Sequence, residues 1–131
     1  MAARYVLDTN VLILALRGNP QALDLIDQLR QEGDLCVSVV TRTEILAGMH
    51  PHEEKLTMAL LASLRSLPLT ADMADHAGRW IYDHARKGIQ ISCPDALIAA
   101  TVVEHGLTLV TTNAAHFPML TSDQVREFSV T

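Results

Sequence analysis

The sequence predicts one α/β domain over residues 1–131, with three α/β/α layers and a central parallel sheet of four to five short strands. The first observation behind this prediction is alternation, because short apolar runs typical of buried strands alternate with longer segments of helical periodicity. The second is composition: 49% of the 131 residues are hydrophobic, which is enough for one core. Alternating strands and helices favour a parallel sheet, since each crossover helix packs on a face of the sheet.

The first elements follow from a short apolar run and its capping residues. Residues 4–7 are predicted as a buried strand. Asp8 and the two polar residues after it supply N-cap side chains for a helix over residues 11–17, which Gly18 ends. A proline opens the next helix, over residues 20–33, and its apolar residues share one face.

The middle of the chain begins with a second strand, predicted over residues 35–40. Thr41 and Glu44 have the spacing of a capping box and predict a helix that ends near residue 48. Leucines at helical spacing predict a further helix over residues 52–66. Residues 67–69 are the weakest strand candidate because the run is so short.

A long amphipathic helix is predicted over residues 70–87, ending at Gly88. The next helix begins at Ser92, has Pro94 in its first turn, and is apolar almost all round to residue 103, so we expect it to be buried. A strand is then predicted over residues 107–111. A short turn or helix at residues 114–120 and a last strand at residues 125–130 complete the fold.

Charge and composition narrow the functional classes. The net charge of −5 excludes a broad basic face, so any RNA contact must be local. The longest apolar run, residues 11–16, is too short to span a bilayer, and no membrane association is expected. No signal-peptide pattern precedes the first strand, and two cysteines do not make a disulfide framework. A cytoplasmic protein is therefore expected.

The basic side chains allow two interpretations. They either form a limited rim for RNA or are simply solvated charges on helix faces. The candidates for such a rim are Arg4, Arg17, Arg42, Arg79, Arg86 and Lys87.

Acidic and amide side chains recur at junctions between elements. Asp8 follows the first strand, Glu44 and Asp95 fall in the first turns of predicted helices, and Asn113 follows the strand at 107–111. Sites in parallel sheets form beyond the carboxyl ends of the strands, so we expect these side chains to meet in one cleft. Three acids in such a cleft repel one another unless a cation is bound, and Mg²⁺ prefers oxygen ligands.

Each of these residues also has a purely structural interpretation. Asp8 is a good helix N-cap, and Glu44 is the reciprocal acid of a capping box. Asp95 complements a helix dipole, and Asn113 is typical of turns. The functional interpretation depends on all four side chains occurring at such junctions in one chain.

Four motifs, in order along nearly the whole chain, carry a resemblance to a known family. They are Tyr5-Val-Leu-Asp8-Thr-Asn-Val, Thr43-Glu44-Ile-Leu-Ala-Gly, Pro94-Asp95-Ala-Leu-Ile-Ala-Ala and Leu109-Val-Thr-Thr-Asn113-Ala-Ala-His-Phe. This pattern resembles the PIN domain and, within it, the VapC-type toxins of bacterial toxin–antitoxin pairs. The fold implied by the resemblance is PIN-like.

The resemblance implies roles for individual residues. Asp8, Glu44 and Asp95 match the family's three metal-site acids and are the expected catalytic residues. Asn113 matches a fourth position of the family's site, where an acid is common. Because an amide lacks the negative charge of a carboxylate, Asn113 is expected to be a weaker ligand, and a second metal ion would be bound poorly. Supporting polar positions are matched by Thr9, Asn10 and Thr111.

The resemblance further implies a Mg²⁺-dependent endoribonuclease, with Mn²⁺ able to substitute, that forms a homodimer and pairs with a VapB-like antitoxin. Asp8 and Asp95 are expected to bind the metal most directly, while Glu44 completes the metal shell or accepts a proton from the attacking water. Arg42 and His116 are candidate RNA contacts. The alternative is a non-catalytic module that binds RNA or protein through a degenerate PIN site.

Overall fold

A computed structural model describes residues 2–130 of the chain. Within these residues five strands form one sheet, in the order β3-β2-β1-β4-β5, and every neighbouring pair is parallel. The strands are β1 (Ala3–Leu7), β2 (Asp34–Ser38), β3 (Arg65–Leu67), β4 (Thr108–Thr111) and β5 (Val125–Glu127). The predicted parallel sheet is confirmed.

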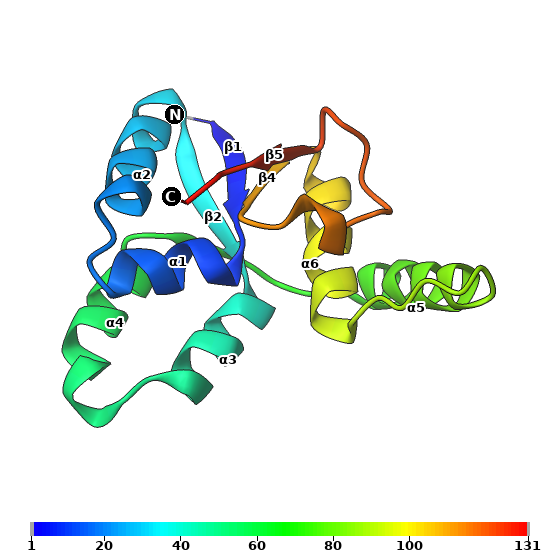
Figure 1. Cartoon of the computed structure of the whole chain (residues 1–131), viewed down its shortest axis with the longest axis horizontal. Helices are drawn as coiled ribbons and strands as arrows, with labels where there is room; N and C mark the ends of the chain where they lie inside the picture. Colours follow the sequence, from blue (N-terminus) through cyan, green and yellow to red (C-terminus); the bar gives the residue numbers. More distant parts are fainter. Residues whose placement is uncertain (1, 131) are drawn as a thin grey trace.

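Helices cover both faces of this sheet, which confirms the three-layer arrangement (Figure 1). They are α1 (Thr9–Leu16), α2 (Pro20–Glu32), α3 (Val39–Gly48), α4 (Glu54–Ala62), α5 (Ala71–Ala85) and α6 (Cys93–His105), with the short 3₁₀ helices η1 (Pro51–Glu53) and η2 (Ala114–His116). Helices α1 and α2 lie on one side of the sheet and α6 on the other, while α5 lies beyond α6 (Figure 1). None of the described helices combines the length and the hydropathy that a bilayer crossing requires.

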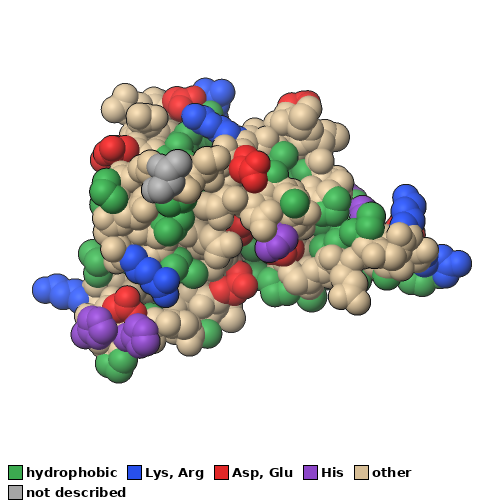
Figure 2. Space-filling view, viewed as in Figure 1, with side chains coloured by type: hydrophobic (Ala, Val, Ile, Leu, Met, Phe, Trp, Pro, Cys, Tyr) green, Lys and Arg blue, Asp and Glu red, His purple; other side chains and the backbone are tan. Residues whose placement is uncertain are grey.

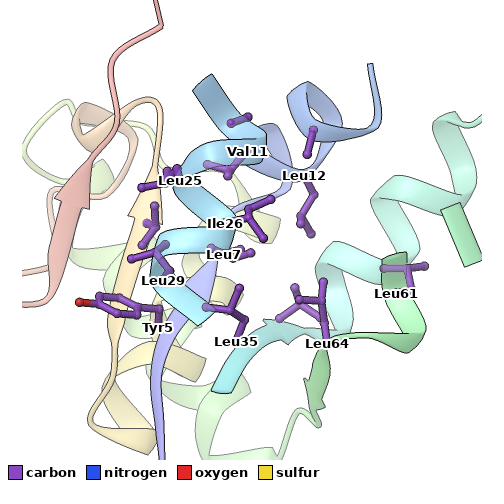
Figure 3. Packing of buried hydrophobic residues seen from close by; sticks show 14 of the residues in the cluster. Tyr5, Leu7, Val11, Leu12, Leu25, Ile26, Leu29, Leu35, Leu61 and Leu64 are labelled. Atoms are coloured by element: carbon purple, nitrogen blue, oxygen red, sulfur yellow. The ribbon is translucent and has the colours of Figure 1, made fainter. Parts of the chain in front are cut away.

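Alternation along the strands divides the core between the two faces. In β1, the fully buried Leu7 packs with side chains of α1 and α2, and Figure 3 shows this cluster between the two helices and the strands. Its neighbour Val6, also fully buried, belongs to the opposite cluster with Ile98 and Val102 of α6. A strand buried on both faces reads as a continuous apolar run, which is why residues 4–7 were recognisable from the sequence.

The strand order places a switch point at the centre of the sheet. From β1 the chain proceeds outward through β2 to β3, and it then returns to β4 on the other side of β1. Crossovers in opposite directions put their helices on opposite faces, because such connections are right-handed. In open sheets of this kind, ligands bind in the crevice where the strand order reverses, here beyond the carboxyl ends of β1 and β4.

Two predicted elements differ from the structure. The second strand ends at Ser38 rather than residue 40, because the Ser38 hydroxyl accepts a hydrogen bond from the Val40 N–H (3.2 Å) and caps α3 there. The predicted helix at 52–66 is wrong beyond Ala62, where α4 ends. Leu64 and Leu67 are buried outside that helix, whereas Leu56 is 59% exposed on it.

Shifts at the other ends are small. The third strand begins at Arg65, two residues earlier than predicted, and the fifth ends at Glu127, three residues earlier than predicted. The ends of elements are the part of a fold that a sequence defines least well.

Gly33 is the position at which an added methyl group is expected to be costly. A Cβ there would lie 2.5 Å from the carbonyl oxygen of Ala2, and backbone cannot move away cheaply. We expect Gly33→Ala to lower the free energy of unfolding by about 1–3 kcal/mol, the usual cost of overpacking.

Gly78→Ala is the matched control, because its Cβ would meet nothing within 4 Å and the site is inside α5. That variant should be up to about 1 kcal/mol more stable. Urea unfolding of both variants tests this, and equal stabilities would contradict it.

Candidate active site

Asp8 occupies the switch point because it ends β1 and caps α1. Its backbone N–H donates to the carbonyl oxygen of Val110 in β4 (2.9 Å), which continues the ladder between the two central strands. The side-chain Oδ1 accepts from the N–H of Thr9 (2.8 Å), and Oδ2 accepts from the hydroxyl of Thr111 at the end of β4 (2.7 Å). Asp8 is only 6% exposed. The carboxylate is therefore fixed in direction, and the capping and site-forming roles of Asp8 coexist.

The electrostatics of Asp8 favour a bound cation. Its pKa is raised from the ordinary value of 3.8, chiefly because burial disfavours the charged form. The hydrogen bonds from Thr111 and Thr9 lower the pKa, but the negative charges of Asp95 and Glu44 raise it again. The carboxylate is thus held in place by donors, and no positive side chain among residues 2–130 contributes to its pKa. A divalent cation would supply that charge and restore the ionised form.

Glu44 reaches the same region from α3, although not in the predicted way. Since Ser38 caps α3, Glu44 lies in the second turn of the helix rather than the first, and Thr41 is a helical residue rather than the cap. The Thr9 hydroxyl donates to Glu44 Oε1 (2.7 Å) and lies 3.1 Å from the hydroxyl oxygen of the buried Thr41. Glu44 is exposed. Its carboxylate is therefore held at one oxygen and open to solvent at the other.

Asp95 lies in the first turn of α6, as predicted. The Ser92 hydroxyl caps this helix by accepting from the N–H of Asp95 (3.2 Å), with Pro94 beside it in the first turn. The Asp95 side chain is 24% exposed, and its Oδ2 is 3.8 Å from Nδ1 of His116. The helix start thus directs a partly buried carboxylate toward the segment that follows β4.

One cleft of about 480 Å³ brings the three acids together. Its lining consists of Asp8, Thr9, Asn10, Ile13, Glu44, Ser92, Asp95 and His116. We call it the acidic cleft. Figure 2 shows acidic side chains and a histidine near the middle of this face, with the Lys and Arg side chains toward its edges. No three Asp, Glu, His or Cys side chains within residues 2–130 form a ready-made metal cage. The arrangement therefore suits an ion that keeps several waters, as Mg²⁺ does.

Other predicted residues lie outside the lining of the acidic cleft. The side-chain amide of Asn113 is 3.0 Å from Nε2 of His116, and its backbone N–H donates to the Thr111 hydroxyl (3.1 Å). Asn113 thus contacts a cleft residue without lining the cleft itself. Arg42 donates to the Ser66 hydroxyl (3.2 Å) and is also absent from the lining. None of the six candidate rim residues lines the acidic cleft.

Two lining residues and one supporting residue were not predicted. Ile13 follows Asn10 by three positions on α1, so the helical period could have placed it. Ser92 was interpreted only as a cap, yet it also lines the cleft. Glu127 in β5 accepts from the N–H of Ala114 (3.2 Å) and so holds the start of η2. No local sequence pattern marks Glu127, because its partner is set by the pairing of β4 with β5.

The raised pKa of Asp8 predicts how stability depends on pH without metal. Below pH 3.8 Asp8 is protonated in both the folded and the unfolded chain, and its burial has no electrostatic cost. As the pH rises through the raised folded-state pKa, the folded chain must bury a charge, so the stabilising contribution of Asp8 is lost. Asp8→Asn should therefore be more stable than the parent chain in EDTA at pH 7, with the difference shrinking toward pH 4. Urea unfolding across this range measures it. A less stable variant at pH 7 would show that capping by the carboxylate dominates.

Comparisons with known proteins identify the family of this chain. Residues 5–118 match the family model of the PIN domain. Ribonuclease VapC10 of Mycobacterium tuberculosis is 40% identical over 114 residues, which cover 87% of this chain and 86% of that protein. Ribonuclease VapC19 of the same organism is 33% identical over 115 residues, covering 87% and 92%.

The fold has a close counterpart among solved structures. A chain of VapBC2 from Rickettsia felis, bound to a DNA fragment from its promoter, superposes with a TM-score of 0.84 and 21% identity, covering 95% of this chain and 98% of that chain. At this identity the likeness shows the fold alone. The family match and the sequence relatives carry the assignment, and they confirm the resemblance noted in the sequence: the chain belongs to the PIN-domain family and, within it, to the VapC ribonucleases.

Proposed function

We propose that this VapC-family ribonuclease is a Mg²⁺-dependent endoribonuclease that cuts RNA in the acidic cleft, with Asp8, Glu44 and Asp95 as its catalytic residues. One observation carries the proposal. Three carboxylates from β1, α3 and α6, far apart in the sequence, line one cleft at the switch point of the sheet. Burial, together with the smaller effect of the neighbouring Asp95 and Glu44 charges, raises the pKa of Asp8. This placement is costly for the fold alone, which favours a functional explanation.

The donors in the acidic cleft fit Mg²⁺, with Mn²⁺ as a substitute. Carboxylate oxygens of Asp8 and Asp95 would hold the ion most directly, and Asn113 is a weaker ligand at most, since its amide contacts His116. The bound ion would supply a water of lowered pKa and neutralise charge on the phosphate. The two Asp8 donors, Thr9 and Thr111, fix the carboxylate so that little rearrangement is needed when a cation binds.

Glu44 has one oxygen engaged and one free. The Thr9 hydroxyl orients its carboxylate by donating to Oε1, and the exposed position lets the other oxygen reach a water or the metal. Glu44 therefore either completes the metal shell or accepts a proton from the attacking water. Thr9 and Asn10, which line the cleft beside it, provide further polar contacts for a phosphate.

Metal removal is the direct test of this function. Purified chain incubated with single-stranded and structured RNAs should cut them in Mg²⁺, stop in EDTA, and resume when Mg²⁺ or Mn²⁺ is added. A crystal soaked in Mn²⁺ should show anomalous density between Asp8 and Asp95. RNA binding without cutting, unchanged by metal, would instead support the non-catalytic module. Cutting that persists in EDTA would overturn the metal mechanism.

The assembly and location of the chain complete the proposal. We propose that residues 1–131 act as one PIN domain and as the toxin of a toxin–antitoxin pair, since the superposed Rickettsia felis structure is a VapBC assembly. A VapB-like antitoxin is then the partner, and the toxin itself is a homodimer. The cytoplasm is the proposed location, because the free thiols of Cys36 and Cys93 are typical of a reducing compartment.

A further inference from the structure

A second cleft continues the acidic cleft along α5. It has a volume of about 600 Å³ and shares Ser92, Asp95 and His116 with the acidic cleft. The rest of its wall comes from the C-terminal end of α5, from the loop that returns to α6, and from η2 and the residues just after it. We call it the α5 groove. Because the two clefts have three residues in common, a chain-like ligand can occupy both at once.

The wall of the α5 groove combines apolar surface with a hydrogen-bonding side chain. Ile81 and Ala85 contribute from the helix, and Ile89 and Gln90 from the loop. Ile89 is 41% exposed, which is high for a large aliphatic side chain. Gln90 is also exposed, and its amide can both donate and accept. Such a surface can pack against the face of an unpaired nucleic-acid base, with an amide to contact its edge.

The far end of α5 carries positive charge on this acidic protein. Arg86 donates to the hydroxyl of Tyr82 (3.0 Å), and its guanidinium lies 5.3 Å from the centre of that ring. Tyr82 is 62% exposed, and Lys87 follows directly, with Asp83 as the acid on the same stretch. In Figure 1 α5 extends away from the sheet, and Figure 2 shows basic side chains at that end of the molecule.

We propose that the α5 groove binds the single-stranded RNA that flanks the phosphate cut in the acidic cleft. Bases pack against Ile89 and its apolar neighbours, and the backbone phosphates extend toward Arg86 and Lys87. The inference rests on the proposed function for the location of the cut. Two features favour RNA over a protein. The groove shares three residues with the proposed cleavage site, and the basic pair Arg86 and Lys87, in the turn between the groove residues Ala85 and Ile89, complements a polyanion on a chain of net charge −5.

Cleavage of short and long substrates tests the groove. In Mg²⁺, Ile89→Glu should raise the KM for a single-stranded RNA of about twelve nucleotides roughly tenfold, because an apolar contact with a base is lost and the new carboxylate repels the backbone phosphates. A dinucleotide, which is too short to reach the groove, should be cut within twofold of the parent rate. Met58→Glu is the matched control, since Met58 is 42% exposed on α4, and it should leave both substrates unchanged.

A binding measurement keeps this inference separate from the proposed function. In EDTA, the double variant Arg86→Ala/Lys87→Ala should bind a fluorescent twelve-nucleotide RNA less tightly, and the slope of log affinity against log salt should fall by about 1.4, as expected for two phosphate contacts to a single strand. Lys55→Ala, on exposed α4, should leave the slope unchanged. If the parent chain cuts no RNA but these binding changes occur, the proposed function is wrong and RNA binding by the α5 groove is supported.

Three other outcomes overturn the groove. The variants could cut and bind the long RNA as the parent does, which leaves the proposed function intact. The variants could cut the dinucleotide and the long RNA equally poorly, which would place the defect in the acidic cleft. Finally, light scattering could show a changed oligomeric state, which would assign this surface to a second copy of the chain.

Discussion

Asp8→Asn is expected to lower metal-dependent RNA cleavage by at least about 100-fold while the chain stays folded. The carboxylate is the most buried of the three acids and is fixed by donors from Thr9 and Thr111. Metal binding provides several kcal/mol of transition-state stabilisation, and each 1.4 kcal/mol corresponds to a tenfold change in rate. Asparagine keeps the shape and can still cap α1, but it removes the negative charge that we propose holds the ion.

The measurement is single-turnover cleavage at saturating Mg²⁺, with calorimetric titration of Mn²⁺ on the same samples. Asp24→Asn removes an equal charge from the exposed face of α2 and serves as the control for net charge. It should cut RNA at the parent rate. If Asp8→Asn retains more than a tenth of the parent activity, or binds Mn²⁺ as tightly as the parent does, Asp8 is not a metal ligand.

Phe117→Ala is expected to have the largest effect on stability. Phe117 is 2% exposed and packs with Ile98 and Val102 of α6 in the cluster on that face of the sheet. Removing a buried phenyl ring costs about 3–5 kcal/mol, through lost burial and the cavity that remains. Phe117 also directly follows η2, and its backbone N–H donates to the carbonyl of Ala114 (3.0 Å), so the buried ring lies at the end of that short helix. The segment that carries His116 should therefore loosen along with the core.

Urea unfolding at 25 °C measures the loss, and cleavage assays at low temperature report on the site. Phe128→Ala provides a comparison, because Phe128 is only partly buried, against the opposite cluster. We expect that variant to lose less than half as much free energy of unfolding. A loss below about 1 kcal/mol in Phe117→Ala would mean that the cavity collapses and that another contact holds the segment.

Much of this architecture could be predicted because local and global preferences agree. Residues 4–7 read as a buried strand, Asp8 as the cap after it, and Ser92 with Pro94 as the start of a helix, and the structure has all three. The start of α3 was missed because Val39 and Val40 are β-branched and extend the apparent strand, while the cap at Ser38 depends on one hydrogen bond. Leucine spacing likewise suggested a longer helix than α4.

The candidate site was predictable to the extent that it depends on strand ends. Asp8 and Glu44 come after β1 and β2, whose carboxyl ends share one edge of the sheet, and the start of α6 brings Asp95 to the same cleft. The direction of side chains in the segment after β4 follows instead from the packing of Phe117 and from the Glu127 contact, neither of which has a local signature. For that reason the placement of Asn113 against His116, rather than in the cleft, did not follow from the sequence.

The hydrogen bond between Asp8 and Thr111 joins residues 103 positions apart, and the ladder between β1 and β4 is equally remote in the sequence. A ribosome that has synthesised only the first three strands has produced a polypeptide with Asp8 and Glu44 but without Asp95, Thr111 or the strand that closes the crevice. Such a nascent chain cannot assemble the acidic cleft. A cell that makes this protein must therefore synthesise the chain through Thr111 before the acidic cleft can form.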